Sequence, residues 1–173
     1  MGTAPSATHR PPTLWQRVVA RLGAPAILHI MRVYPPYLGA GIRPTHIDAR
    51  FREIDVEMPL KPWNRNYVGT HFGGSLYAMC DPFFMLMVME NLGSGYVVWD
   101  KSATIDFLRP GRGRVCASFR ITDAELDAIR DEVSRAGRAY PRFEVLVVDD
   151  SGEAVARIGK VLSVRPAGGK ANG

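Results

Sequence analysis

A short polar segment followed by an isolated carboxylate offers the most direct chemistry in this chain. Gly73 and Gly74 permit close approach to the backbone, and Asp81 stands among apolar residues of an expected helix. A carboxylate in apolar surroundings must be paired, neutralised or used in function. Asp81 is therefore the leading candidate for a general base that activates water or for a nucleophile. The alternative is a structural ion pair with Lys101 or an arginine.

The neighbours of Asp81 have both functional and structural interpretations. Asn66 could orient a carbonyl group or a water molecule, or it could hold its loop as an Asx-turn. The N–H groups of Gly73 and Gly74 at a helix start could polarise a carbonyl oxygen, or the glycines could serve close packing. Cys80 lacks a base placed to activate it and is interpreted as a buried, inert thiol.

Two helices and one alternating segment are expected before this region. Residues 14–22 and 26–33 carry apolar side chains at helical spacing, and Pro35-Pro36 should end the second helix. From Ile47 to Met58 the apolar residues alternate, with a one-residue slip near Arg52-Glu53. This pattern predicts a strand that contains a β-bulge.

The central element is an expected helix from Gly73 to Leu92. It is apolar on nearly every side and should be buried all round, with a kink at Pro82. Four strands should follow, mainly connected by hairpins, with one helix that begins at a capping box formed by Thr122 and Glu125. The predicted strands span residues 96–108, 114–121, 143–149 and 154–164. The expected class is α+β, with an antiparallel sheet wrapped around the buried helix.

Composition excludes several classes of protein. The 173 residues suit one domain, at 39–166, preceded by a helical segment at 13–38 and flanked by disordered tails at 1–12 and 167–173. The net charge of +5 favours an anionic small molecule, since the arginines are too dispersed for a nucleic-acid-binding arm. The two cysteines form no disulfide or zinc pattern, which makes a reducing cytoplasm the default location. No apolar run is long enough to span a membrane.

The segment from Asn66 to Asp81 resembles the site of hot-dog-fold acyl-CoA thioesterases of the phenylacetate-pathway type. Asn66, Gly69, Gly73, Gly74 and Asp81 match the family spacing. Phe72 occupies the position of the family histidine, and His71 is displaced from it by one residue. The segments 98–102 and 105–111 also resemble a bacterial branch known only as a domain of unknown function.

This resemblance implies a hot-dog fold and hydrolysis of an acyl-CoA or related thioester. It implies Asp81, Asn66, Gly73 and Gly74 as the catalytic set, with Gly69, His71 and Phe72 contacting the substrate. It also implies a homodimer or homotetramer with sites built between subunits, and no metal or redox cofactor. Two alternatives stay open, namely a non-catalytic acyl-CoA or lipid-binding protein and a hot-dog dehydratase or hydratase that uses His71.

Basic residues beyond the helix are candidates for the phosphates of coenzyme A. Arg109, Arg112 and Arg114 surround the Pro110-Gly111 turn, where a solvated loop is the alternative. Lys101 shares a strand face with apolar residues. It could pair with Asp81, receive a phosphate, or extend to the sheet edge.

Overall fold

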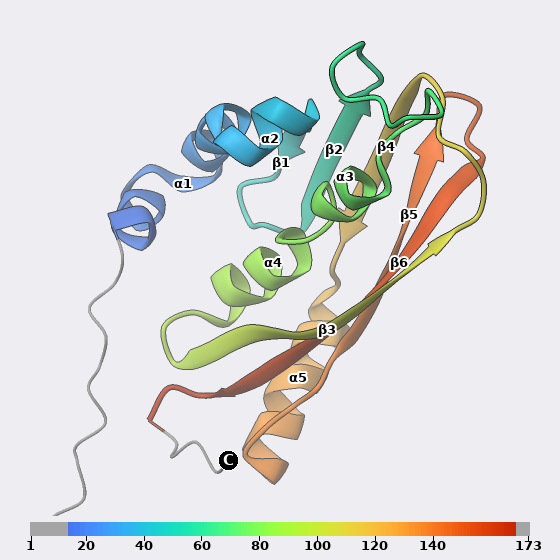
Figure 1. Cartoon of the computed structure of the whole chain (residues 1–173). Helices are drawn as coiled ribbons and strands as arrows, with labels where there is room; N and C mark the ends of the chain where they lie inside the picture. Colours follow the sequence, from blue (N-terminus) through green and yellow to red (C-terminus); the bar gives the residue numbers. More distant parts are fainter. Residues whose placement is uncertain (1–13, 169–173) are drawn as a thin grey trace, which may run out of the picture.

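The computed structural model describes residues 14–168 (Figure 1). The disorder predicted for residues 1–12 and for most of 167–173 lies outside the described residues. The helices are α1 (Leu14–Val33), α2 (Pro35–Ala40), α3 (Gly73–Ala78), α4 (Phe83–Leu92) and α5 (Asp123–Ala136). The strands are β1 (Arg43–Ile47), β2 (Glu53–Pro59), β3 (Tyr96–Phe107), β4 (Arg114–Arg120), β5 (Arg142–Asp149) and β6 (Ala154–Pro166).

The N-terminal segment is helical, as the apolar spacing predicts. Gly23 kinks α1 with a φ of 67°, a backbone conformation in which glycine carries no steric penalty. Pro35 and Pro36 do more than end this helix, because they begin the further helix α2, which the sequence interpretation missed. Proline is well suited to the first helical positions, where the missing N–H has no intrahelical partner.

The prediction of one bulged strand between Ile47 and Met58 is wrong. Residues 48–52 form a turn between two antiparallel strands, β1 and β2. The Asp48 carboxylate accepts backbone N–H bonds from Arg50 at 3.1 Å and Glu53 at 2.8 Å, and a further one from Arg52. Phe51 adopts a φ of 54° to close the turn. The Asp48 side chain thus takes the place of strand-to-strand hydrogen bonds where the chain reverses. The register irregularity between β1 and β2 lies between Pro44 and His46, not near Arg52-Glu53.

A single six-stranded antiparallel sheet has the order β1-β2-β4-β5-β6-β3. The expectation that the last four strands are mainly hairpin-connected is therefore only partly right. The β5–β6 hairpin closes through Gly152, but β3 pairs with β6 rather than with β4. After the buried helix, β3 forms one edge of the sheet, and the chain then crosses to form β4 beside β2. Strands β1 and β3 are therefore the two edges of the sheet.

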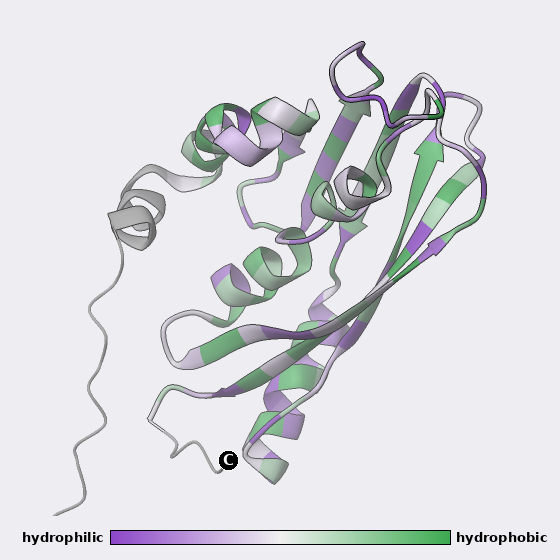
Figure 2. Ribbon diagram, viewed as in Figure 1, coloured by the Kyte–Doolittle hydropathy of each residue, from purple (hydrophilic) through white to green (hydrophobic). Residues whose placement is uncertain are grey.

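The buried helix is divided into α3 and α4, which lie against one face of the sheet (Figure 1). Residues 79–82 form a turn at Pro82, where the sequence predicts a kink. Helix α4 is almost entirely hydrophobic (Figure 2), and Phe83, Met87 and Val88 are fully buried against the sheet. The predicted capping box begins α5, whose Leu126 and Ile129 join the same core.

The turn at Asp48 generates a stability prediction. Asp48→Ala should lower the free energy of unfolding by about 1–2 kcal/mol, because backbone N–H groups lose a charged acceptor. Urea denaturation followed by circular dichroism measures the change. Asp131→Ala is the matched control, since Asp131 is exposed on α5. Equal stability of the Asp48 variant and the wild type would contradict the role given to this carboxylate.

Candidate active site

Asp81 lies at the break between α3 and α4, and its side chain is 46% exposed. Its Oδ1 atom accepts two hydrogen bonds, one from Tyr77 Oη at 2.5 Å and one from Lys160 Nζ at 2.6 Å. Tyr77 is one helical turn earlier, whereas Lys160 comes from β6. Within residues 14–168, no donor contacts the other carboxylate oxygen, Oδ2. This oxygen is free to interact with water or a substrate.

Lys160 is the site residue that the sequence interpretation missed. Its side chain is only 2% exposed, and its ammonium also lies 3.1 Å from Asp100 Oδ2 and 3.1 Å from Tyr77 Oη. Lys160 occupies an inward position of β6 between Ile158 and Leu162, which are both buried. A lysine at an inward position of an alternating strand is a signal that could have identified it, because a buried ammonium requires an anionic partner.

The ion pair determines the charge of both partners. Partial burial alone would raise the pKa of Asp81, but hydrogen bonds from Lys160 and Tyr77 outweigh burial and hold this pKa below its usual 3.8. Burial would lower the pKa of Lys160, yet the same contacts raise it to about 12. Asp81 is therefore a carboxylate and Lys160 an ammonium at neutral pH.

Two more ionisable groups lie in the same region. Burial raises the pKa of Asp100 despite the opposing effect of Lys160, so the cluster pairs one ammonium with two carboxyl groups of unequal acidity. Tyr37 reaches inward from α2, and its pKa is raised by burial first and by the charge of Asp81 second. The Tyr37 hydroxyl is buried and has no hydrogen-bond partner among the residues described.

The two glycines at the start of α3 lie in close contact with aromatic rings. A Cβ on Gly73 would come within 2.9 Å of Phe107, and a Cβ on Gly74 would come within 2.5 Å of Phe72. A side chain at either position would therefore have to displace an aromatic ring. Their N–H groups belong to the first turn of α3, where a helix supplies no intrahelical acceptor.

The hydrogen bonds of the Asn66 side chain lie within its own loop. Its Oδ1 atom accepts from the N–H groups of Val68 at 3.1 Å and Thr70 at 3.0 Å, while Nδ2 donates to Thr70 Oγ1 at 2.9 Å and to the His71 carbonyl at 3.1 Å. Gly69 completes this turn with a φ of 79°. These contacts match the Asx-turn interpretation, and in this conformation Asn66 shapes the loop that leads into α3.

His71 connects this loop to the β3–β4 connection. The ring is 3% exposed, with Nε2 at 2.9 Å from the Gly113 carbonyl, and the His71 N–H donates to the Gly111 carbonyl at 3.1 Å. Burial lowers the pKa of His71 below 6.5, although the Gly113 contact opposes this effect. The neighbouring Phe72 side chain is 59% exposed. His71 is thus a buried, neutral ring that joins two loops.

The basic residues considered for phosphate binding differ in the partners that they contact. Arg109 binds Asp149 at 2.7 Å and also binds Glu153, and Arg114 binds Asp150 at 2.7 Å. Arg112 is exposed and contacts no carboxylate in the described part of the chain. Lys101 does not approach Asp81, because its ammonium lies 3.7 Å from the centre of the Tyr140 ring.

Cys80 next to Asp81 is 2% exposed, and burial raises the pKa of its thiol. The thiolate that nucleophilic chemistry requires is therefore disfavoured. Within residues 14–168 there is no group of three or more side chains able to hold a metal ion. No helix in that range is long and apolar enough to cross a bilayer.

The chain belongs to a family described as a domain of unknown function, DUF4442, whose model matches residues 24–164. This is consistent with the resemblance to a branch of unknown function. No curated protein matches the sequence. Membership of this family identifies residues 24–164 as one domain but assigns no reaction to it.

Solved structures share the fold at low sequence identity. A protein of unknown function from Pseudomonas aeruginosa, described as a probable thioesterase, has a TM-score of 0.73 at 19% identity, covering 82% of this chain and 95% of that chain. A thioesterase from Haemophilus influenzae has a TM-score of 0.61 at 17% identity, covering 85% and 92%. A Chlorobaculum tepidum protein of unknown function has a TM-score of 0.65 at 19% identity, covering 82% and 93%. The expected hot-dog fold is confirmed.

The ion pair generates a titration prediction. Lys160→Met should raise the pKa of Asp81, because the carboxylate loses its cationic hydrogen-bond donor. Carboxyl carbon NMR measures this pKa. Lys101→Met is the matched control and should leave the pKa unchanged, since Lys101 contacts Tyr140 instead.

The same variant tests the pH dependence of stability. The folded-state pKa of Asp81 lies below 3.8, so its ionisation stabilises the fold above pH 3.8, and this stabilisation is lost as the pH falls through the folded-state pKa. Lys160→Met should weaken this acid dependence in urea titrations. An unchanged pKa and an unchanged acid profile would contradict the proposed coupling.

Proposed function

We propose that this protein hydrolyses an acyl thioester, with acyl-CoA as the leading substrate class. The main support is the Asp81 carboxylate, which two donors hold on one oxygen while the other oxygen stays open. The fold shared with proteins described as thioesterases adds to this support. A cytoplasmic location remains a prediction.

In the first form of the mechanism, Asp81 is a general base. Oδ2 takes a proton from water as the water oxygen adds to the thioester carbonyl carbon. The carbon–sulfur bond then breaks, and the leaving thiolate accepts that proton, so that one water and one thioester become a carboxylic acid and a thiol. A low pKa makes Asp81 a weak base, but it keeps the group ionised throughout the neutral range.

In the second form, Asp81 is the nucleophile. Oδ2 attacks the carbonyl carbon and the thiolate leaves. Water then hydrolyses the resulting mixed anhydride and releases the carboxylic acid, and the remaining proton of that water passes to the thiolate, which restores the Asp81 carboxylate and gives the free thiol. The N–H groups of Gly73 and Gly74 would polarise the carbonyl oxygen in both forms. Asn66 would contribute by fixing the loop that presents these amides, since its own amide is engaged within that loop.

The contacts of His71 favour hydrolysis by a carboxylate over a histidine-dependent dehydratase or hydratase. The His71 ring is buried and engaged with the Gly113 carbonyl, whereas such an enzyme requires an imidazole that reaches its substrate. A non-catalytic acyl-CoA binder would use the same fold without turnover. Among the phosphate candidates, Arg112 is better placed than Arg109 or Arg114 to accept an anion, because it has no carboxylate partner to displace.

We further propose that two copies pair along β3. This strand is a sheet edge of 12 residues, and it is exposed along most of its length, including Trp99 at 65% and Phe107 at 60%. A long edge with exposed aromatic side chains needs a cover. Pairing here would bring the second copy close to Phe107, which packs on Gly73, and would build each site between subunits.

Replacing the carboxylate tests the reaction. Asp81→Asn should lower kcat for acyl-CoA hydrolysis by about a hundredfold or more while retaining affinity for the substrate, because it removes the reacting oxygen anion. Release of free thiol from a panel of acyl-CoA thioesters measures turnover. Asp131→Asn on the exposed face of α5 is the control and should be fully active. Binding without hydrolysis by the wild-type protein would instead support the non-catalytic alternative.

Replacing an edge aromatic tests the assembly. The wild-type protein should sediment as a dimer or a larger assembly, and Trp99→Glu should shift it toward the monomer by placing a charge in the paired edge. Leu146→Glu is the control, because Leu146 is 40% exposed on β5 inside the sheet. A monomeric wild type in analytical ultracentrifugation would refute pairing along β3.

A further inference from the structure

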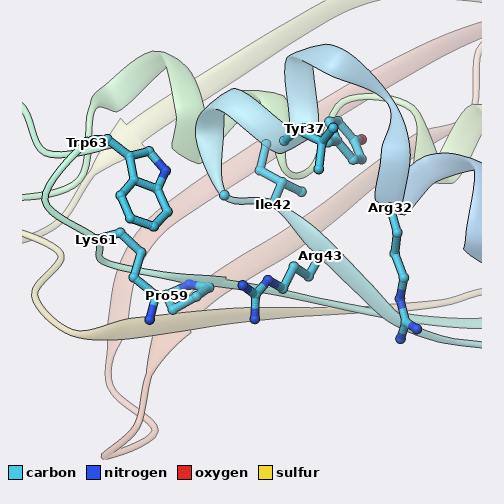
Figure 3. A pocket seen from close by; sticks show the side chains of 9 residues that line it. Arg32, Tyr37, Ile42, Arg43, Pro59, Lys61 and Trp63 are labelled. Carbon is cyan, nitrogen blue, oxygen red and sulfur yellow. The ribbon is translucent and has the colours of Figure 1, made fainter.

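A basic pocket that does not include Asp81 lies between the N-terminal helices and the β1–β2 hairpin (Figure 3). Its volume is about 280 Å³. Arg32 at the end of α1, Arg43 at the start of β1 and Lys61 after β2 contribute to its lining, and no acidic residue does. Three separate elements therefore bring positive charges to one hollow.

These three cations have no carboxylate partner within residues 14–168. Glu57 is opposite Arg43 in the β1–β2 register, but its carboxylate lies 3.5 Å from Arg114 instead. Arg32 is held by a bond from Nε to the Pro44 carbonyl at 2.9 Å, and its terminal nitrogens remain available. Figure 3 shows the Arg43 and Lys61 side chains near Pro59, with Arg32 further along the pocket, so an anion bound beside Pro59 could receive donors from both Arg43 and Lys61.

The pocket also offers apolar surface beside its charges. The Trp63 indole is 68% exposed and Leu38 is 57% exposed, although both line the hollow. In Figure 3, the side chains of Lys61 and Arg43 extend toward Pro59, with the Trp63 ring on the Lys61 side. An anion bound by the cations would thus carry its adjoining group against an aromatic ring.

We propose that this pocket binds a phosphate ester whose neighbouring group packs on Trp63. A phosphate offers several acceptor oxygens to donors that approach from different directions, as Arg43 and Lys61 do, and guanidinium groups bind it in a bidentate manner. A planar ring or an acyl glycerol next to the phosphate would cover the indole. Free nucleotides and phospholipid headgroups both carry this chemistry. The inference does not depend on thioester hydrolysis, since binding alone tests it.

Calorimetric titration of the full chain with adenosine 3′,5′-bisphosphate tests whether the pocket binds a nucleotide. Adenosine, which lacks phosphate, is the comparison ligand. Sedimentation with phosphatidylglycerol vesicles tests whether the pocket binds a lipid headgroup. Phosphatidylcholine vesicles, which carry no net charge, are the comparison. The double variant Arg43→Gln, Lys61→Gln should weaken binding by about tenfold or more, because it removes two charged donors. The double variant Arg135→Gln, Arg142→Gln removes equal charge from exposed positions elsewhere and should bind as the wild type does.

Each arm has a result that supports the site. Binding of the bisphosphate but not of adenosine, lost in the Arg43, Lys61 variant alone, assigns the pocket to nucleotides. Binding to anionic vesicles only, with the same dependence on that variant, assigns it to a lipid headgroup. Equal weakening in both double variants would mean that net charge, rather than a pocket, attracts the anion. That result, or no binding in either arm by the wild type, would overturn the inference.

Discussion

The contact between the Lys160 ammonium and the Asp81 carboxylate is the interaction on which the candidate site depends. Lys160 is almost fully buried, and an ammonium in that position is unstable without an anion close to it. Asp81 meets this requirement with one oxygen and presents the other to its surroundings. The same pair connects β6 to the break in the buried helix, so a contact between sheet and helix also orients the Asp81 carboxylate.

That break follows from the constraints on a helix packed against a sheet. Pro82 has no backbone N–H to donate and ends regular hydrogen bonding between α3 and α4. Asp81 stands within the interruption, where its side chain reaches both Tyr77 and Lys160. The long apolar face of α4 secures the helix in the core, while the short α3 presents its first turn toward Phe107 of β3.

The arginines considered as anion-binding residues differ in whether a carboxylate neutralises them. Those near the end of the β5–β6 hairpin, such as Arg109 and Arg114, are neutralised by carboxylates and stabilise the turns there. Arg43, in the pocket beside Trp63, has no such partner among the described residues. A positive net charge therefore gives no direct measure of anion binding, because the capacity to bind an anion depends on which cations lack a partner.

The sequence by itself determined most of the local structure. The periodicity, the proline at the helix break and the Thr122–Glu125 capping box predicted most strands and the described helices other than α2, because these depend on neighbouring residues. The resemblance around Asp81 predicted the fold. The turn at Asp48 was misread, since alternation continues through residues whose hydrogen bonds go to a side chain.

Only the tertiary structure decided how distant parts meet. The pairing of β3 with β6 and the approach of Lys160 to Asp81 join residues far apart in the chain, and spacing holds no information about such contacts. The same holds for Lys101, which the sequence offered as a partner for Asp81. It lies at the register irregularity between Asp100 and Ser102, and its ammonium contacts the Tyr140 ring. Local patterns follow from short-range geometry, whereas the partner of a buried charge follows from the packing of the whole sheet.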